Sequence, residues 1–130
     1  MTIFNANVGG NQNLELIWKN TSPTSSFAAK EVNCEAIYDY KFFIVKLRQS
    51  TGNSGVINAI LTRGAATDIQ KVINMTGSST PTILNRQILA SISGYLSFAD
   101  CVNKKYNSTS ETANNTFLIP LEIYGIKNAR

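Results

Sequence analysis

Turn-forming residues interrupt this chain about every ten residues, and short apolar segments fill the intervals between them. Clusters of glycine, proline and small polar residues occupy positions 20–26, 50–55 and 76–81. Between them, apolar and polar side chains alternate with the two-residue period of strands. The clearest example spans residues 40–49, where Phe43, Val45 and Leu47 share one face. About eight such strands, without a sustained helical period, predict an all-β fold, and we expect a jelly-roll-like sandwich of antiparallel sheets.

A proline-containing corner is expected between the first two strands. Alternation up to Trp18 predicts a strand, and the polar run 20–26 predicts a turn in which Pro23 fixes its own φ. Phe27 then opens a second strand over residues 27–34. Because buried aromatic rings mostly serve packing, we expect Trp18 and Phe27 to anchor the core on the two sides of this corner. Stacking of Trp18 on a ligand is the alternative.

The second half of the chain contains one long polar stretch between two predicted strands. Residues 95–102 are predicted as one strand, and residues 103–115 as a surface loop. Residues 116–127 close the fold as a strand that includes Pro120 and Tyr124. Since proline lacks an N–H donor, we expect this strand to lie at a sheet edge near Pro120, or to be bulged there.

Length and composition predict one sandwich domain, over residues 14–130, preceded by a flexible arm over residues 1–13. Charged residues make up only 15% of the chain, below the usual quarter, and Asn, Ser and Thr replace them. Such neutral polar surfaces are typical of extracellular or virion proteins and of carbohydrate contact. The first residues carry no secretory signal, and no apolar run is long enough for a membrane span. We therefore expect synthesis in the cytoplasm and no membrane partner.

The residue types present restrict the chemistry. The chain has no histidine, which removes the commonest general base and metal ligand, so no metal or cofactor is expected. Basic residues are scattered rather than clustered, which argues against nucleic-acid binding. We expect no enzymatic activity. The alternative is glycoside hydrolysis by a carboxylate pair, for which four acidic residues lie in or near predicted loops: Asp39, Asp68, Asp100 and Glu111.

Two cysteines, Cys34 and Cys101, lie far apart in the sequence. They are able to form one disulfide only if the fold brings them within bonding distance, which the sequence leaves open. Because Cys101 alternates with apolar positions, we expect it to be a buried free thiol.

Sugar recognition usually combines an exposed aromatic ring with nearby Asn, Asp or Arg side chains. Three places in the sequence offer this combination: Tyr38 and Tyr40 with Asp39, Arg63 with Asp68, and Tyr106 within the polar stretch 103–115. Each has a simpler explanation as a surface tyrosine or a solvated charge. Arg63 and Asp68 flank one short loop, so they are also able to pair with each other.

Two motifs, one near each end, suggest a family. They read Trp18-x-Asn20-x-x-Pro23-x-x-x-Phe27-Ala28-Ala29 and Ile119-Pro120-x-x-Ile123-Tyr124-Gly125-Ile126-Lys127. The chain thereby resembles small virion and tail-fibre-associated proteins of tailed bacteriophages and prophages of Gram-positive bacteria. The resemblance implies a virion component in a tail fibre or baseplate, assembled as a homotrimer with other virion proteins. It also implies structural roles for Trp18, Pro23, Phe27, Pro120 and Tyr124.

Two functions are therefore expected from the sequence. The first is a tip module that binds a bacterial cell-surface polysaccharide, which requires exposed aromatic and polar side chains in the loops. The alternative is a capsid decoration or tail-assembly protein without a ligand of its own, which requires an apolar surface buried by association. Apolar outer faces predicted over residues 42–44 and 118–124 favour oligomers in both cases.

Overall fold

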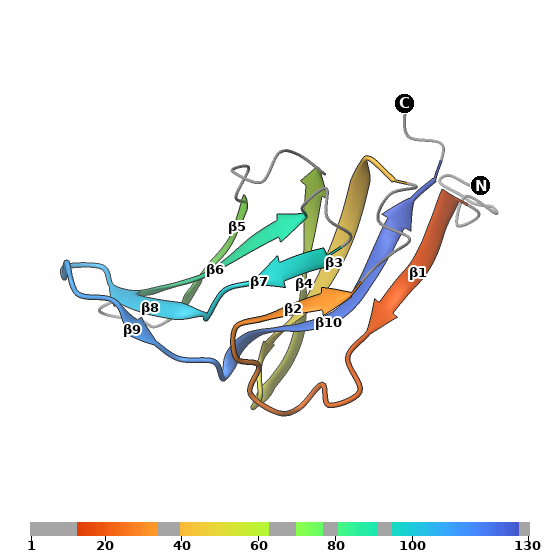
Figure 1. Cartoon of the computed structure of the whole chain (residues 1–130). Helices are drawn as coiled ribbons and strands as arrows, with labels where there is room; N and C mark the ends of the chain where they lie inside the picture. Colours follow the sequence, from red (N-terminus) through yellow and green to blue (C-terminus); the bar gives the residue numbers. More distant parts are fainter. Residues whose placement is uncertain (1–12, 34–39, 63–69, 77–80, 91–94, 128–130) are drawn as a thin grey trace, which may run out of the picture.

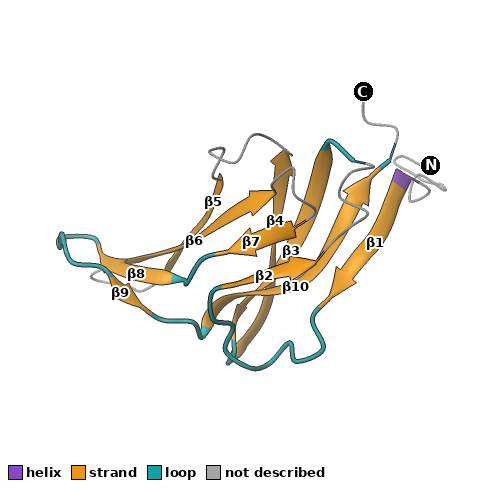
Figure 2. Cartoon of the chain, in the orientation of Figure 1, coloured by secondary structure: helices purple, strands orange, loops and turns teal. Residues whose placement is uncertain are grey.

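The structure, a computed structural model, describes residues 13–33, 40–62, 70–76, 81–90 and 95–127. The predicted arm, residues 1–13, falls almost entirely outside these ranges. The described residues form strands and turns, and the strands assemble into two sheets (Figures 1 and 2). Every strand pairing is antiparallel. The predicted antiparallel all-β sandwich is confirmed.

The first sheet has four strands in the order β1-β10-β3-β4. Their bounds are Leu14–Lys19 for β1, Phe117–Ile126 for β10, Phe42–Ser50 for β3 and Asn53–Thr62 for β4. The turn between β3 and β4 lies in the cluster of turn-forming residues at 50–55, and the two strands pair as a hairpin. The first and last strands of the chain thus lie side by side, with β10 between β1 and β3.

The second sheet has six strands, with the path β2-β7-β6-β8-β9 and with β5 paired to β6. Their bounds are Lys30–Asn33 for β2, Gln70–Thr76 for β5, Thr82–Ala90 for β6, Tyr95–Phe98 for β7, Val102–Lys105 for β8 and Thr112–Ala113 for β9. The chain passes from sheet to sheet after β1, β2, β4 and β9. Figure 1 shows β8 and β9 projecting past the four-stranded sheet.

The core fills the space between the two sheets. Phe43, Val45 and Leu47 of β3 point into it and are fully buried, as their alternation predicts. From the opposite sheet, Leu84 and Ile88 of β6 meet them. β3 alternates between one buried and one wetter face, which is the arrangement that a period of two residues encodes.

The predicted strand over residues 27–34 begins later than expected, at Lys30. Phe27 lies in the preceding loop but is buried. Its ring meets Trp18 edge-on at 6.2 Å and Phe98 at 5.4 Å, measured between ring centroids. Its N–H donates to the Asn115 carbonyl (2.9 Å), so the backbone here bonds to a loop rather than to a sheet neighbour.

The predicted single strand over residues 95–102 is wrong, because the structure divides it into β7 and β8. Both pair with the same edge of β6, since β5 occupies the other edge. The chain leaves the ladder at residues 99–101, where the Ala99 carbonyl accepts from Arg86 instead (2.7 Å). The predicted loop 103–115 is also wrong in part, because most of β8 and all of β9 lie within it. These strands consist mostly of polar residues and form through backbone pairing. The sequence therefore lacks the apolar alternation that would predict them.

Pro120 lies in a central strand, which corrects the expectation of a sheet edge. The alternative, a bulge, is confirmed by a register shift between Pro120 and Glu122. Pairing with β1 ends at Glu122, and beyond it the Asn20 amide Nδ2 donates to the Pro120 carbonyl (2.8 Å). Leu118 has a positive φ of 50°, so Leu118 and Ile119 are both fully buried. The predicted alternation, which placed Leu118 on the outer face, fails there for this reason.

A fully buried arginine joins the two sheets. Arg86 of β6 donates to three backbone carbonyls: from Nε to Leu118 (2.9 Å), from Nη1 to Ala99 (2.7 Å) and from Nη2 to Phe117 (3.1 Å). Its guanidinium lies 5.5 Å from the centroid of the Phe27 ring. Burial lowers the pKa of Arg86 from its usual value. The planar fork of donors thus holds the positive-φ turn of β10 and the break between β7 and β8 in place.

Cys101 is the last residue of that break and is a buried free thiol, as predicted. Burial raises the pKa of Cys101, and the nearby charge of Arg86 opposes the rise. Cys34 lies outside the described residues.

Candidate functional site

Four of the six predicted ligand residues lie outside the described residues: Tyr38, Asp39, Arg63 and Asp68. Tyr40 and Tyr106 are described, and the structure separates them. Tyr40 precedes β3 next to the four-stranded sheet, whereas Tyr106 follows β8 at the projecting end of the six-stranded sheet.

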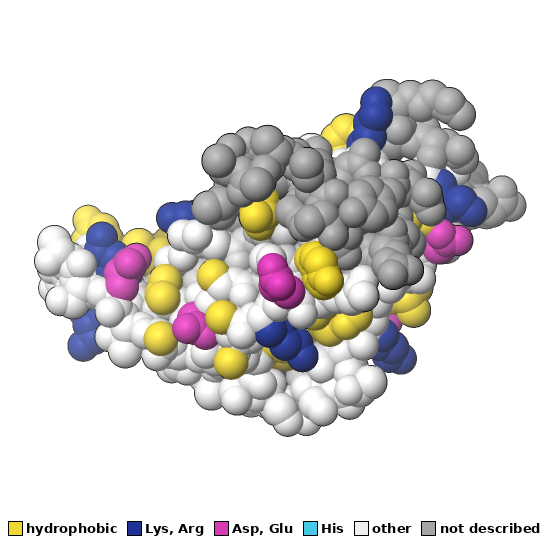
Figure 3. All heavy atoms as spheres, viewed as in Figure 1, with side chains coloured by type: hydrophobic (Ala, Val, Ile, Leu, Met, Phe, Trp, Pro, Cys, Tyr) yellow, Lys and Arg dark blue, Asp and Glu magenta, His cyan; other side chains and the backbone are white. Residues whose placement is uncertain are grey.

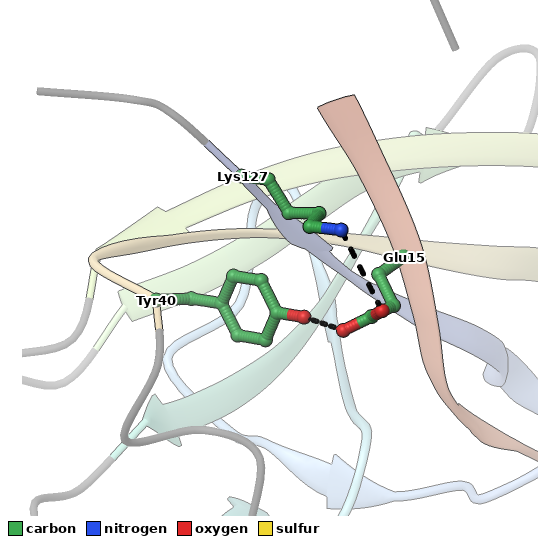
Figure 4. Close-up of polar contacts among 3 residues, drawn as sticks. All are labelled: Glu15, Tyr40 and Lys127. Atoms are coloured by element: carbon green, nitrogen blue, oxygen red, sulfur yellow. Dashed lines mark hydrogen bonds and ion pairs between the residues drawn. The ribbon is translucent and has the colours of Figure 1, made fainter. Parts of the chain in front are cut away.

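Tyr40 is buried, which contradicts its prediction as an exposed ligand tyrosine. Its ring packs against Phe43 (6.1 Å between centroids) and lies over Gly125 of β10. Figure 4 shows its hydroxyl directed at Glu15, to which it donates, while the Lys127 ammonium lies 3.8 Å from the same carboxylate. Regular alternation in β3 begins only at Phe42, so it does not fix the direction of the Tyr40 side chain.

Tyr106 is 71% exposed, and its sequence neighbours Lys105 and Ser108 line a polar cleft. The cleft has a volume of about 300 Å³ and is lined by amide, hydroxyl and ammonium side chains: Thr82, Asn103, Lys105, Ser108, Ser110 and Thr112. We call it the Asn103 cleft. Tyr106 itself is anchored by its N–H, which donates to the Pro81 carbonyl (2.8 Å).

The pairing register of β6, β8 and β9 brings the side chains of the Asn103 cleft together. Thr82 of β6 lies opposite Lys105 of β8, and Asn103 lies opposite Thr112 of β9, so these four side chains share one sheet face. The connecting loop is fixed by short-range bonds, because the N–H of Ser108 donates to the Lys105 carbonyl (3.0 Å) and that of Ser110 to the Ser108 hydroxyl (3.0 Å). The site therefore rests on a sheet and a tight loop.

One side-chain atom of the residues that line this cleft lacks a partner. The Asn103 Oδ1 is buried, and among the described residues no donor reaches it. A buried acceptor without a hydrogen bond costs about 1–3 kcal/mol, so such atoms usually meet water or a ligand. Residue types in the sequence point to Tyr106 and the stretch 103–115 but not to Thr82, which joins the cleft only through sheet pairing.

A second groove, of about 330 Å³, lies on the opposite face of the same strands. Its polar lining includes Lys71, Asn85, Gln87, Asp100 and Glu111. Two of the four carboxylates considered for glycoside hydrolysis thus share one groove. However, Asp100 accepts from the Ala29 N–H (2.9 Å) and from Asn115 Nδ2 (2.8 Å), and these bonds lower the pKa of Asp100. A general acid needs the opposite shift, so Asp100 is unsuited to that role.

Replacing Asp100 by asparagine is expected to flatten the dependence of stability on acid pH. Hydrogen bonds to the charged form place the folded-state pKa below the unfolded-state value of 3.8. The stabilisation is therefore present above that value and is lost as the pH falls through the lower folded-state pKa. Urea midpoints measured from pH 7 to pH 2 should show that the wild-type advantage over Asp100→Asn shrinks on acidification. A constant difference would contradict this.

The visible surface agrees with the low charge content. Figure 3 shows acidic and basic side chains interspersed among neutral polar surface on this face. Within the described ranges, no three Cys, Asp or Glu side chains gather as a metal site would require. In the same ranges, no helix has the length and apolar character needed to cross a membrane.

This chain matches no protein-family model, no curated protein and no solved structure. The geometry of the Asn103 cleft and the sequence motifs are therefore the basis for a functional proposal.

Proposed function

We propose that this protein is a structural component of a bacteriophage virion, a tail-fibre or baseplate tip module that binds a host-surface polysaccharide in the Asn103 cleft. The phage assignment rests on the two terminal motifs. The observation that carries the binding role is the polar cleft of hydroxyl, amide and ammonium side chains, with the exposed Tyr106 next to Lys105 in the sequence.

The side chains of the cleft suit a sugar. The hydroxyls of Ser108 and Ser110, which line the cleft, both donate and accept, so they suit the hydroxyl groups of a sugar. Lys105 supplies donors only and favours a polymer with anionic groups. Tyr106 offers an exposed ring for the apolar face of a sugar. Together these groups provide the combination of ring and polar side chains that sugar recognition uses.

Assembly into a homotrimer would strengthen polysaccharide binding even if each cleft binds weakly. A homotrimer attached to other virion proteins would present three clefts to a repeating polysaccharide. Linked sites raise the effective concentration at the second and third binding events, so avidity exceeds the affinity of one cleft. The virion location and the trimer are part of this proposal.

The alternative is a capsid decoration or tail-assembly protein without a ligand of its own. The observation that favours it is the outer face of the four-stranded sheet, where Leu14, Leu16, Val56 and Ile60 are exposed. Such a protein would bind another virion protein and no bacterial surface.

Tyr106→Ala and Asn103→Ala are each expected to weaken polysaccharide binding about tenfold or more, the loss typical of a central contact. The measurement is binding of labelled protein to intact Gram-positive host-type bacteria, with extracted wall polysaccharide as competitor. Tyr95→Ala is the matched control, because Tyr95 is also exposed (39%) but lies on β7, outside the cleft.

Saturable binding that free polysaccharide abolishes, and that only the cleft variants lose, would support the proposal. Absence of binding by the correctly assembled protein would exclude the tip role and favour the assembly alternative. Equal losses in all three variants would exclude the Asn103 cleft as the site.

A further inference from the structure

β4 forms one edge of the four-stranded sheet, because the strand order ends there. It is ten residues long, and along its other side it pairs with β3 from Phe42 to Ser50. An edge strand of this length presents a row of backbone groups that another strand is able to pair with. Soluble proteins usually protect such edges with charges, proline, bulges or short strands.

The other edge strands that the structure describes have this protection. β1 contains Glu15 and Lys19, β2 contains Lys30 and Glu31, and β5 contains Lys71. β9 has only two residues. β4, with the sequence NSGVINAILT, contains neither a charged residue nor a proline. Its edge is therefore chemically suited to strand pairing.

The solvent-facing side of β4 is apolar as well. Val56 is 55% exposed and Ile60 is 68% exposed, and they flank Asn58 at equal distances along the strand. Strand register continues this surface across the sheet, because Ile60 lies opposite Ile44, Ile44 opposite Tyr124, and Tyr124 opposite Leu16. An apolar row thus crosses all four strands and reaches the edge at β4.

We infer that β4 pairs antiparallel with β4 of a second copy of this chain, about a two-fold axis at Asn58. Such a pairing sets Val56 beside Ile60 of the second copy, and Ile60 beside Val56, so both exposed side chains gain an apolar neighbour. The two Asn58 amides meet at the axis, where each is able to donate to and accept from the other. The strand is complementary to itself, which is the requirement of a two-fold interface.

A second copy of this uncharged strand fits the edge better than a charged partner strand, because β4 has no charged side chain that would attract one. The pairing joins two four-stranded sheets into one continuous sheet and makes the two apolar rows continuous. It is independent of the Asn103 cleft, which lies on the other sheet. Two-fold pairing gives a dimer, or a hexamer when it is combined with the proposed three-fold assembly.

The test is the mass of the full chain, measured by sedimentation equilibrium over a range of concentrations. Wild type is expected at an even multiple of the 14.2 kDa chain mass, and Ile60→Lys is expected to halve that mass. Ile73→Lys is the matched control, because Ile73 is similarly exposed (59%) but lies on β5. Circular dichroism verifies that both variants keep the β fold.

A second variant tests the register of the proposed β4–β4 pairing without placing a charge at the interface. Asn58→Cys is expected to form a disulfide-linked dimer under mild oxidation, since opposite residues of paired strands lie within bonding distance. Ser54→Cys is the control, because the proposed axis moves the two copies of residue 54 far apart. Three results would each overturn the inference. The first is a wild-type mass equal to one chain or to an odd multiple of it. The others are a mass that Ile60→Lys leaves unchanged and equal cross-linking at both cysteine positions.

Discussion

Arg86→Met is expected to lower the free energy of unfolding by about 3–4 kcal/mol. The substitution leaves the carbonyls of Leu118, Ala99 and Phe117 without their donor in the interior. Each unsatisfied buried group costs about 1–3 kcal/mol. The total cost of the three unsatisfied carbonyls is partly offset, because burying methionine, unlike burying the guanidinium, does not require a charge to be desolvated. Urea denaturation followed by Trp18 fluorescence measures the change.

Arg86→Lys separates charge from geometry. A lysine keeps the positive charge, but a single ammonium group cannot reproduce a planar fork directed at three carbonyls. We expect it to remain at least about 2 kcal/mol less stable than wild type, within the range for one or two lost hydrogen bonds to a charged group. Full stability in the lysine variant, or a methionine variant within about 1 kcal/mol of wild type, would show that the three bonds contribute little.

Gly125→Ala is expected to cost about 2–3 kcal/mol, the upper range for overpacking a core site. A Cβ at this position would lie 2.6 Å from three atoms of the Tyr40 ring. The ring is buried and its hydroxyl is bonded to Glu15, so it has little room to move (Figure 4). The strand must shift instead. The measurement is the midpoint of urea unfolding, compared between variants whose free energy of unfolding has the same dependence on urea concentration.

A double-mutant cycle assigns the cause. If the clash with the ring produces the loss, Gly125→Ala should cost much less in a Tyr40→Ala background, with a coupling of about 1–3 kcal/mol. Tyr40→Phe is the control, because it removes the bond to Glu15 but keeps the ring. Additive costs in the alanine background would place the origin of the loss elsewhere.

The sequence predicted those parts of the fold in which one face of a strand is buried and the other is wet. β3 is the best case, because Phe43, Val45 and Leu47 alternate without interruption. Prediction failed where the backbone departs from a regular strand. The positive φ of Leu118 shifts the pattern of β10, and the break at residues 99–101 divides a strand that reads as continuous. Neither event has a local sequence signal.

The candidate site was only partly predictable. Tyr106 and the polar stretch around it were identified from residue types, but the contribution of Thr82 depends on pairing between β6 and β8. Tyr40 was wrongly expected at the surface because its side-chain direction is set outside a regular strand. Arg86 was not recognised as a core residue. Its position between Leu84 and Ile88, at the spacing of one sheet face, is the signal that identifies it.

The central place of β10 also affects how the chain folds during translation. β3 and β4 are able to form a local hairpin early, but β1 and β3 meet their common neighbour only after Ile126 has left the ribosome. The closing contacts join residues more than a hundred positions apart, and such high contact order slows folding to milliseconds or seconds. Until then β1 and one edge of β3 lack their native partner. In a crowded cell this interval favours association between nascent chains, and it gives chaperones a substrate.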